Sequence, residues 1–282
     1  MTRPLGIIAG KGHLPGLIAK ACLARGETIF VVRLQGLADE ALKAYPGVEL
    51  NVGQVGGAFE ALKQANCEGV VFAGYVIRPD FSSIRFDAAG QAMLPKIAEA
   101  AAKGDGDSLS VFAEAFQGAG FKVLGGQAAY PELLCPQGVL TRAEPDAQAV
   151  KDIAKAWHVA GVIGGEDIGQ GCVVCAGLVT AVEAQEGTDL MLARAAEIDV
   201  TYQGARPDRL GVLVKRPKPN QDLRLDLPAI GVRTVELAAR AGLAGIGLQA
   251  GASIIVDRRE TIAFADEAGV FIAGLTDTGD LL

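Results

Sequence analysis

Short apolar runs alternate with helical stretches in the first half of the chain. Residues 5–9 form an apolar run that leads into a glycine-rich turn, and residues 17–25 are typical of a helix. Further runs rich in β-branched residues follow at 28–34 and 69–72. A strand, a turn, a helix and a second strand indicate a parallel sheet with right-handed crossovers. We therefore predict a Rossmann-like sheet, continued by helices at 92–102 and 108–117 and a strand at 121–124.

The pattern breaks where Pro131 and Pro136 interrupt it, and we place a domain boundary between residues 132 and 133. The second half again mixes the two periods. It predicts helices at 146–157, 189–198 and 234–241 and strands at 172–183, 210–214 and 253–256, while glycines obscure any period at 159–170. We expect an α/β fold of two domains, an N-terminal Rossmann-like domain (1–132) and a C-terminal α/β domain (133–282).

Composition and charge exclude several classes of function. The formal net charge of −7 argues against a nucleic-acid partner, which would favour a basic surface. The N-terminus does not resemble a signal peptide, and no uncharged apolar run is long enough to span a bilayer. The five scattered cysteines are typical of reduced thiols. We expect a cytoplasmic protein.

The first glycine loop carries Gly10, Gly12 and His13 but departs from a dinucleotide fingerprint. Pro15 stands where that motif has its third glycine, and the next strand ends in Arg33 rather than an acidic residue that would hold a ribose. Backbone amides at the start of the following helix could bind a phosphate or nucleotide. A plain tight turn is the equal alternative, and an NADP-dependent reductase that uses Arg33 is a weaker one.

Thiol, zinc and triad chemistry lack the residues they need. Cys172 and Cys175 have C-x-x-C spacing, but in a strand this separation points the two thiols to opposite faces. The chain has only two histidines, His13 and His158, and no second cysteine pair. We therefore interpret the cysteines as core residues and do not expect a Ser-His-Asp triad.

Carboxylates gather where a predicted strand turns into a helix. Glu183, Glu186, Thr188 and Asp189 lie within seven consecutive positions. In one interpretation Thr188 caps the helix and Asp189 complements its dipole. In the other, carboxylates and amides at the end of a strand form a ligand site, as in many α/β proteins.

A second acidic segment, 221–228, alternates leucine with charged residues. An extended chain would put Asp222, Arg224 and Asp226 on one face, with the two aspartates about 13 Å apart. One aspartate would then be a ligand while the other pairs with Arg224, or the segment is a solvated edge strand. The basic segment 215–219 and Arg78 suit a diphosphate or, equally, solvated turns.

Five segments in order along the chain resemble one bacterial family, the UDP-2,3-diacylglucosamine pyrophosphatases of the LpxI type. They are IAGKGHLP (8–15), GYVIRP (74–79), GDGDS (104–108), VEAQEGTD (182–189) and QDLRLDLP (221–228). The last two are the specific ones. Lys11 stands where the family is expected to have a third consecutive glycine.

The resemblance implies two α/β domains with the substrate between them. It also implies hydrolysis, dependent on Mg²⁺ (or Mn²⁺), of UDP-2,3-diacylglucosamine to UMP and 2,3-diacylglucosamine 1-phosphate (lipid X) in lipid A biosynthesis. Asp226 is then the leading catalytic position, with Asp189, Glu186 and Glu183 as neighbours. We hypothesise that Asp226 and Asp189 hold the ion, that Glu183 or Glu186 orients water, and that Arg224 supports Asp226. The expected substrate-binding residues are Gly10, Gly12, His13, Arg78, Thr188 and Arg224.

The expected partner is the UDP-linked lipid. Because that substrate partitions into the inner membrane, we also expect peripheral contact with it; a homodimer stays open as an alternative to a monomer. The competing hypothesis is a non-catalytic module that binds a nucleotide sugar or phosphate, which would need the glycine loop and arginines but no carboxylate cluster.

Overall fold

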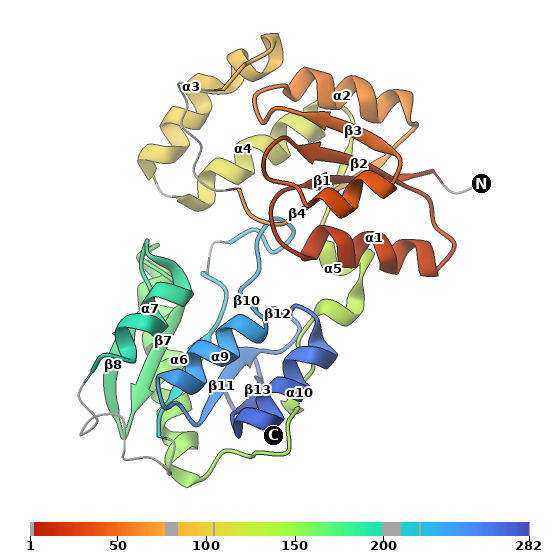
Figure 1. Cartoon of the computed structure of the whole chain (residues 1–282). Helices are drawn as coiled ribbons and strands as arrows, with labels where there is room; N and C mark the ends of the chain where they lie inside the picture. The colour runs from red at the N-terminus through yellow and green to blue at the C-terminus, as the bar shows by residue number, and fades with distance from the viewer. Residues whose placement is uncertain (1–2, 77–83, 104, 199–209, 220, 282) are drawn as a thin grey trace. The chain divides into compact units, whose positions relative to one another are not determined.

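The protein is α/β throughout, as predicted, and divides into two compact units (Figure 1). The computed structural model describes residues 3–76, 84–103, 105–198, 210–219 and 221–281. The units are Met1–Pro131 and Glu132–Leu282, so the division falls at the first of the prolines that interrupt the sequence pattern. In the described part of the chain, every helix is too short or too polar to cross a bilayer.

The N-terminal unit is built on a parallel sheet of five strands in the order β3-β2-β1-β4-β5. The strands are β1 (Leu5–Ala9), β2 (Ile29–Leu34), β3 (Gly47–Leu50), β4 (Gly69–Ala73) and β5 (Lys122–Leu124). The chain builds outward from β1 in one direction and then returns to its other side with β4. This reversal is the switch point of a Rossmann-like fold, so that prediction is confirmed.

Helices cover both faces of this sheet. Helices α1 (Leu14–Ala24) and α5 (Gly126–Ala129) pack on one face, and α2 (Val55–Gln64) and α4 (Asp105–Gly118) on the other (Figure 1). Helix α3 (Ala88–Lys103) packs on α2 and α4. The ring of Phe116 on α4 meets Phe59 of α2 and Phe72 of β4 edge to face, at 4.9 and 5.2 Å between centroids. Aromatic burial thus fixes these helices on the sheet.

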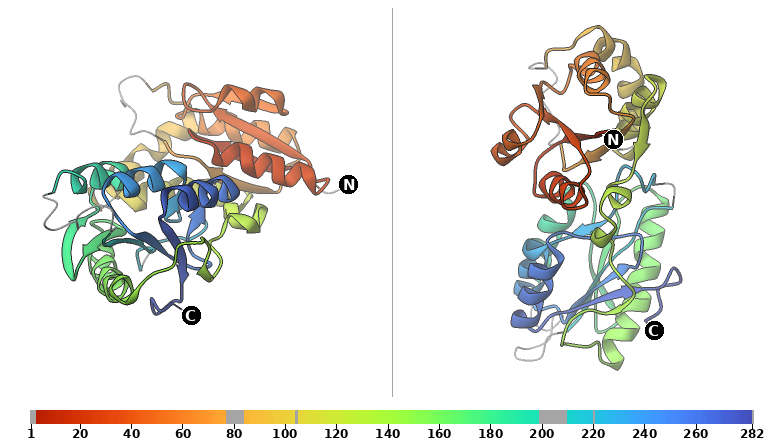
Figure 2. Two further views of the ribbon diagram at one scale, coloured as in Figure 1. Left: turned by 60° about the horizontal axis from the view of Figure 1, so that its bottom comes forward. Right: turned by 90° about the vertical axis from the view of Figure 1, so that its right-hand side faces the viewer.

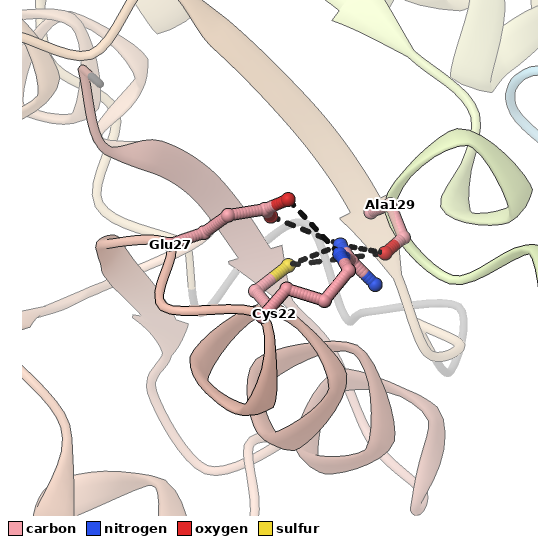
Figure 3. Close-up of polar contacts among 4 residues, drawn as sticks. Cys22, Glu27 and Ala129 are labelled. Carbon is pink, nitrogen blue, oxygen red and sulfur yellow. Dashed lines mark hydrogen bonds and ion pairs between the residues drawn. The ribbon is translucent and has the colours of Figure 1, made fainter.

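Arg25 ties the end of α1 to α5. Its guanidinium donates to both carboxylate oxygens of Glu27 at 2.9 Å and to the carbonyl of Ala129 (Figure 3). The Cys22 thiol lies beside this cluster, and burial raises its pKa to about 11. The cluster satisfies the last carbonyl of α5 and needs no ligand.

The C-terminal unit is built on a mixed sheet in the order β6-β13-β11-β9-β7-β8. The strands are β6 (Gly138–Val139), β7 (Gly171–Cys175), β8 (Leu178–Val182), β9 (Val212–Lys215), β11 (Gly245–Gln249) and β13 (Phe271–Leu275). Strands β9, β11 and β13 are parallel, whereas β7 is antiparallel to both β8 and β9. Short strands β10 (Ala229–Ile230) and β12 (Ile254–Ile255) pair beside it.

Alternate residues of β9 face two different cores. Val212 and Val214 join Trp157 of α6 (Ala147–Gly165), which covers one face of the sheet (Figure 2, left). Leu213 joins Met191 in the core on the other face. The helices of that second face are α7 (Gly187–Ala195), α9 (Val232–Arg240) and α10 (Arg258–Ala268).

Two of the predicted elements have the wrong extent. The strand predicted at 172–183 is a hairpin, because Ala176 and Gly177 adopt left-handed φ angles of 50° and 80° and reverse the chain. Their amides donate to the buried carboxylate of Asp152 at 2.9 and 2.7 Å, which holds the turn. The glycines of 159–170 also do not end a helix, since α6 continues through them to Gly165.

Strand β11 was not predicted from the sequence because it carries two glycines, Gly245 and Gly247, and glycine within a strand weakens it. A Cβ at Gly245 would lie 2.3 Å from ring carbons of the buried Phe271 on the neighbouring strand β13. The ring therefore fills the space of the missing side chain. This pairing is a property of the folded sheet and is invisible within a short sequence window.

Candidate functional site

The C-terminal ends of β8 and β9 meet at one edge of the C-terminal sheet. Both strands run antiparallel to β7, which lies between them, so both end beside the first residue of β7, Gly171. Glu183 follows β8 directly, and Lys215 is the last residue of β9. Helix α7 begins nearby at Gly187. Strand ends that face a helix N-terminus commonly form ligand sites in α/β proteins.

Lys215 is buried, with 3% of its surface exposed. Its Nζ donates to Thr188 Oγ1 at 2.6 Å and to the Ala229 carbonyl at 3.3 Å, and lies 4.0 Å from Glu183 Oε1. A buried ammonium requires such acceptors and a nearby opposite charge. Sequence analysis placed Lys215 at the start of a basic segment that suits a diphosphate or, equally, a solvated turn; the residue ends a strand and is buried instead.

Glu183 is also buried, at 6% exposed, and its two carboxylate oxygens have different surroundings. Oε1 accepts a hydrogen bond of 2.7 Å from the Thr188 hydroxyl. Oε2 has no hydrogen-bond partner within the described part of the chain. The interpretation of Thr188 as a helix cap is wrong: the N-cap of α7 is Glu186, and the Thr188 hydroxyl bonds Glu183 instead.

The segment 221–228 is a turn, so the extended conformation predicted for it is wrong. Asp222 causes the bend: its Oδ1 accepts the Arg224 amide at 2.9 Å, as in an Asx-turn, and its carbonyl accepts the amides of Leu225 and Asp226. Arg224 also pairs with the Asp222 carboxylate, at 2.6 Å from Nη2 to Oδ2. This pair lowers the pKa of Asp222, so Arg224 supports Asp222 rather than Asp226.

The turn brings Asp226 within electrostatic reach of the buried charges of Lys215 and Glu183. Its Oδ2 accepts a hydrogen bond of 2.5 Å from Gln221 Nε2. The residue keeps solvent contact, but protein atoms crowd its carboxylate, and this desolvation raises its pKa. The Gln221 hydrogen bond and the charges of Lys215 and Lys218 act in the opposite direction, whereas the charge of Glu183 raises the pKa further. Asp226, Lys215 and Glu183 therefore lie within electrostatic reach of one another.

The other two predicted carboxylates, Glu186 and Asp189, lie at the start of α7. Glu186 pairs with Arg194 at 2.8 Å, and that hydrogen bond lowers the pKa of Glu186. Asp189 is exposed in the first turn of α7. Among the described residues, the structure thus joins Glu183 and Thr188 directly but records no contact that joins Glu186 or Asp189 to Asp226.

The donor set suits magnesium bound together with phosphate. No group of three or more His, Cys, Asp or Glu in the described ranges is close enough to hold a metal ion by itself. Mg²⁺ commonly uses one or two protein carboxylates and takes its other ligands from water and substrate phosphates. Asp226 provides hard carboxylate oxygens of this kind. The residues therefore fit a substrate-assisted Mg²⁺ site and do not form a closed cage.

In the N-terminal unit, the glycine loop is pinned by a neighbouring loop. Lys11 and Tyr75 exchange backbone hydrogen bonds of 2.9 and 3.0 Å. Gly12 has a left-handed φ of 101°, and a Cβ on Gly10 would lie 2.8 Å from the Tyr75 carbonyl. A tight turn accounts for both glycines, and a phosphate contact there, or at the exposed His13 that follows, stays a prediction.

Two further sequence predictions have different outcomes. Arg78 lies outside the described residues. Arg33 donates to the backbone carbonyls of Leu42 and Tyr45, both at 3.3 Å, so its guanidinium supports the adjoining 3₁₀ helix η1 (Glu40–Ala44). This use of Arg33 gives no support to the reductase alternative.

Sequence analysis did not single out Lys215 or Gln221 as site residues. A signal for Lys215 existed in the run Leu213-Val214-Lys215. Alternate residues of a strand share a face, so Lys215 lies on the same face as the apolar Leu213. Gln221 had no comparable signal, because its role depends on how the turn folds back.

Comparisons with known proteins agree with one another over nearly the whole chain. The family model described as the LpxI N-terminal domain matches residues 4–133, and that described as the LpxI C-terminal domain matches residues 136–273. A protein of Caulobacter vibrioides, named UDP-2,3-diacylglucosamine pyrophosphatase LpxI, is 48% identical over 273 residues, which cover 97% of this chain and 98% of that protein.

One solved structure matches with only weak similarity. A Thermus thermophilus UDP-glucose 4-epimerase in complex with NAD is 15% identical, with 99% of this chain and 88% of that chain covered. Its TM-score of 0.32 is too low to support an argument about fold or function. The two family models and the near-complete relative are sufficient without it: the chain belongs to the LpxI family.

Proposed function

We propose that this chain hydrolyses the diphosphate bond of UDP-2,3-diacylglucosamine and releases UMP and 2,3-diacylglucosamine 1-phosphate for lipid A biosynthesis. The relative that supports this substrate is named for the same lipid and aligns with almost the full length of both chains. An alignment of that extent includes both domains, so it is not a similarity of one module alone.

A diphosphate resists water because its negative oxygens repel a nucleophile, and this chain is itself acidic, with a net charge of −7. A bound Mg²⁺ (or Mn²⁺) would supply a Lewis acid that masks this charge. Asp226 would hold the ion, and Asp189, which adjoins Thr188 in α7, would contribute through water. Both assignments follow from the chemistry of carboxylate oxygens and stay proposals.

Glu183 is the residue we assign to the attacking water. Its buried Oε2 is a strong acceptor without a protein partner among the described residues, so it can accept a hydrogen bond from water and take its proton. The water oxygen bonds to one phosphorus, the bridging P–O bond breaks, and the bridging oxygen leaves on the other phosphate. Each product thus carries one new terminal oxygen, one from water and one from the bridge.

The observation that carries the proposal is the hydrogen-bonded chain of Glu183, Thr188 and Lys215 within electrostatic reach of Asp226. Buried polar atoms are nearly always paired, and leaving one unpaired costs about 1–3 kcal/mol. A charged cluster with an unpaired acceptor at a strand edge is expensive for a fold and useful for catalysis. A non-catalytic binding module would have no need for it.

The test is product analysis of the lipid substrate in ¹⁸O-labelled water, with and without Mg²⁺. We expect UMP and the sugar phosphate, with the label in one product only, and no turnover without the ion. Asp226→Ala should reduce turnover by orders of magnitude. Glu236→Gln, which alters an exposed ion pair with Arg233 on α9, serves as the control. Wild-type protein that binds the lipid but releases no UMP would refute the proposal.

We also propose that the enzyme meets its substrate at the membrane surface, because two acyl chains anchor that substrate in lipid. Leu190 supports this, since it is 62% exposed and lies two residues after Thr188. Sedimentation with vesicles that contain the substrate should recover wild-type protein, and Leu190→Asp should reduce recovery. Equal recovery of both would contradict a role for Leu190. Light scattering measures whether the chain is the homodimer left open by its sequence.

A further inference from the structure

We propose that Lys215, Thr188 and Gly171 position Glu183, so that one of its carboxylate oxygens is fixed while the other is left for the reacting water. This inference rests on the proposed hydrolysis and extends it. Lys215 and Gly171 had no assigned role, and Thr188 changes from a substrate-binding residue to a positioning residue.

The direction of the hydrogen bonds from Lys215 to Glu183 is fixed by chemistry. A lysine ammonium only donates, and a hydroxyl has a single proton. Thr188 Oγ1 therefore accepts a hydrogen bond from Lys215 at 2.6 Å and must donate its own to Glu183 Oε1 at 2.7 Å. Lys215 is held in turn by the Ala229 carbonyl at 3.3 Å. The chain has one polarity, and it orients Oε1.

Because the Thr188 hydroxyl has only one proton, Thr188 is also not available to donate a hydrogen bond to the substrate. A phosphate oxygen requires a donor, and the Thr188 proton is already given to Glu183. The hydroxyl instead restricts the rotation of the Glu183 carboxylate and so fixes its plane. Preorganised groups of this kind act on catalysis by holding the reacting group in its productive geometry.

Gly171 provides the space for the second oxygen. Glu183 N donates to the Gly171 carbonyl at 2.8 Å, so the two residues are paired across the hairpin. A Cβ at Gly171 would lie 2.6 Å from Glu183 Oε2, closer than van der Waals contact allows. Any side chain at this position would displace the oxygen that lacks a protein partner in the described structure.

The experiment compares two shape-matched variants, Thr188→Val and Thr188→Ser. Valine keeps the shape of threonine and removes the hydroxyl, whereas serine keeps the hydroxyl. We expect Thr188→Val to lower kcat by about tenfold or more with KM nearly unchanged, because general-base catalysis contributes about 10²–10⁴-fold. Thr188→Ser should retain kcat within roughly threefold, since the donor to Glu183 survives.

A double-mutant cycle shows whether Thr188 acts through Glu183. If it does, Thr188→Val should add little to Glu183→Gln, whereas independent effects would multiply. Gly171→Ala should lower kcat as well. Gly165→Ala, where an added Cβ meets nothing within 4 Å, is its control. Lys215→Met should resemble Thr188→Val if it folds, and the threonine pair decides the question if it does not.

The outcomes separate the two proposals. Wild-type protein that releases no UMP defeats the proposed function. Two other outcomes defeat the positioning inference alone. In the first, Thr188→Val leaves wild-type turnover unchanged. In the second, Thr188→Val and Thr188→Ser reduce turnover equally, with a matching drop in melting temperature. Multiplicative effects of Thr188→Val and Glu183→Gln also overturn it.

Discussion

The side-chain amide of Gln221 donates to Asp226 Oδ2 at 2.5 Å, while its carbonyl oxygen accepts the backbone amide of Lys218 at 3.0 Å. One side chain therefore spans the turn and fixes the leading carboxylate of the site to the backbone after β9. Such outer partners orient a ligand group without touching the reacting atoms.

Asp226→Asn should lower the turnover and raise the stability of the folded chain. Turnover should fall by orders of magnitude, because an amide is a poor ligand for a hard cation. Desolvation raises the pKa of Asp226 in the folded chain, so folding favours the protonated form; that stabilisation is full below the unfolded pKa and is lost as pH rises through the folded pKa. In EDTA, the variant should thus melt higher than wild type at neutral pH, with the difference vanishing in acid. An unchanged or lower melting temperature at neutral pH would contradict this account.

Gln221→Ala should move the acid limb of the pH–rate profile. The Gln221 hydrogen bond lowers the pKa of Asp226, so its loss should raise that pKa and shift the limb to higher pH. Loss of an outer partner typically reduces metal affinity or activity by about 10- to 100-fold. The measurement is kcat against pH at saturating Mg²⁺, with Gln148→Ala, which removes a side-chain hydrogen bond to Asp152 on α6, as the comparison. A limb that stays in place would assign it to another group.

Asp152→Ala should destabilise the C-terminal domain without changing the catalytic rate of the folded protein. Its buried carboxylate accepts the amides of Ala176 and Gly177 in the β7–β8 turn, and the site lies at the opposite end of these strands. Two unpaired amides should lower the free energy of unfolding by about 2–4 kcal/mol. Urea unfolding measures the loss. Asp152→Asn, which keeps one acceptor, should fall between, and kcat per folded molecule should be unchanged in both.

The five cysteines should resist alkylation in the native protein. Burial raises the pKa of Cys135 and Cys172 to about 12 and that of Cys175 to about 11, so almost no thiolate exists near pH 8. All five are buried as unpaired thiols. Mass spectrometry after iodoacetamide treatment should find little label until denaturant is added. Rapid native labelling of Cys172 and Cys175 would restore a redox role for the C-x-x-C pair.

Gly245→Ala should destabilise the sheet, because the new methyl group would overlap the Phe271 ring. Overpacking of this kind costs about 1–3 kcal/mol. Gly165→Ala, with open space around it at the end of α6, should be neutral or slightly stabilising. Thermal unfolding of the two variants checks the contrast, and equal melting temperatures would mean that the sheet opens to accept the methyl group.

Local patterns by themselves determined the α/β class and the Rossmann-like first sheet, and they indicated the acidic segments of the candidate site. These follow from the chain alone because side-chain periodicity of 2 or 3.6 residues and glycine or proline turns are properties of a short window. The importance attached to Glu183 and Asp226 also came from motifs of a few residues, as part of the family resemblance.

Tertiary structure alone decided how those segments meet. Lys215 is buried at the end of β9 and donates to Thr188 in α7, and the Thr188 hydroxyl donates to Glu183 after β8, so these contacts join residues of three separate elements. Each depends on burial and on the pairing of polar groups excluded from water, and these conditions exist only once the strands are side by side. In a sequence a lysine is expected to be solvated, whereas the folded sheet buries the charged side chain of Lys215.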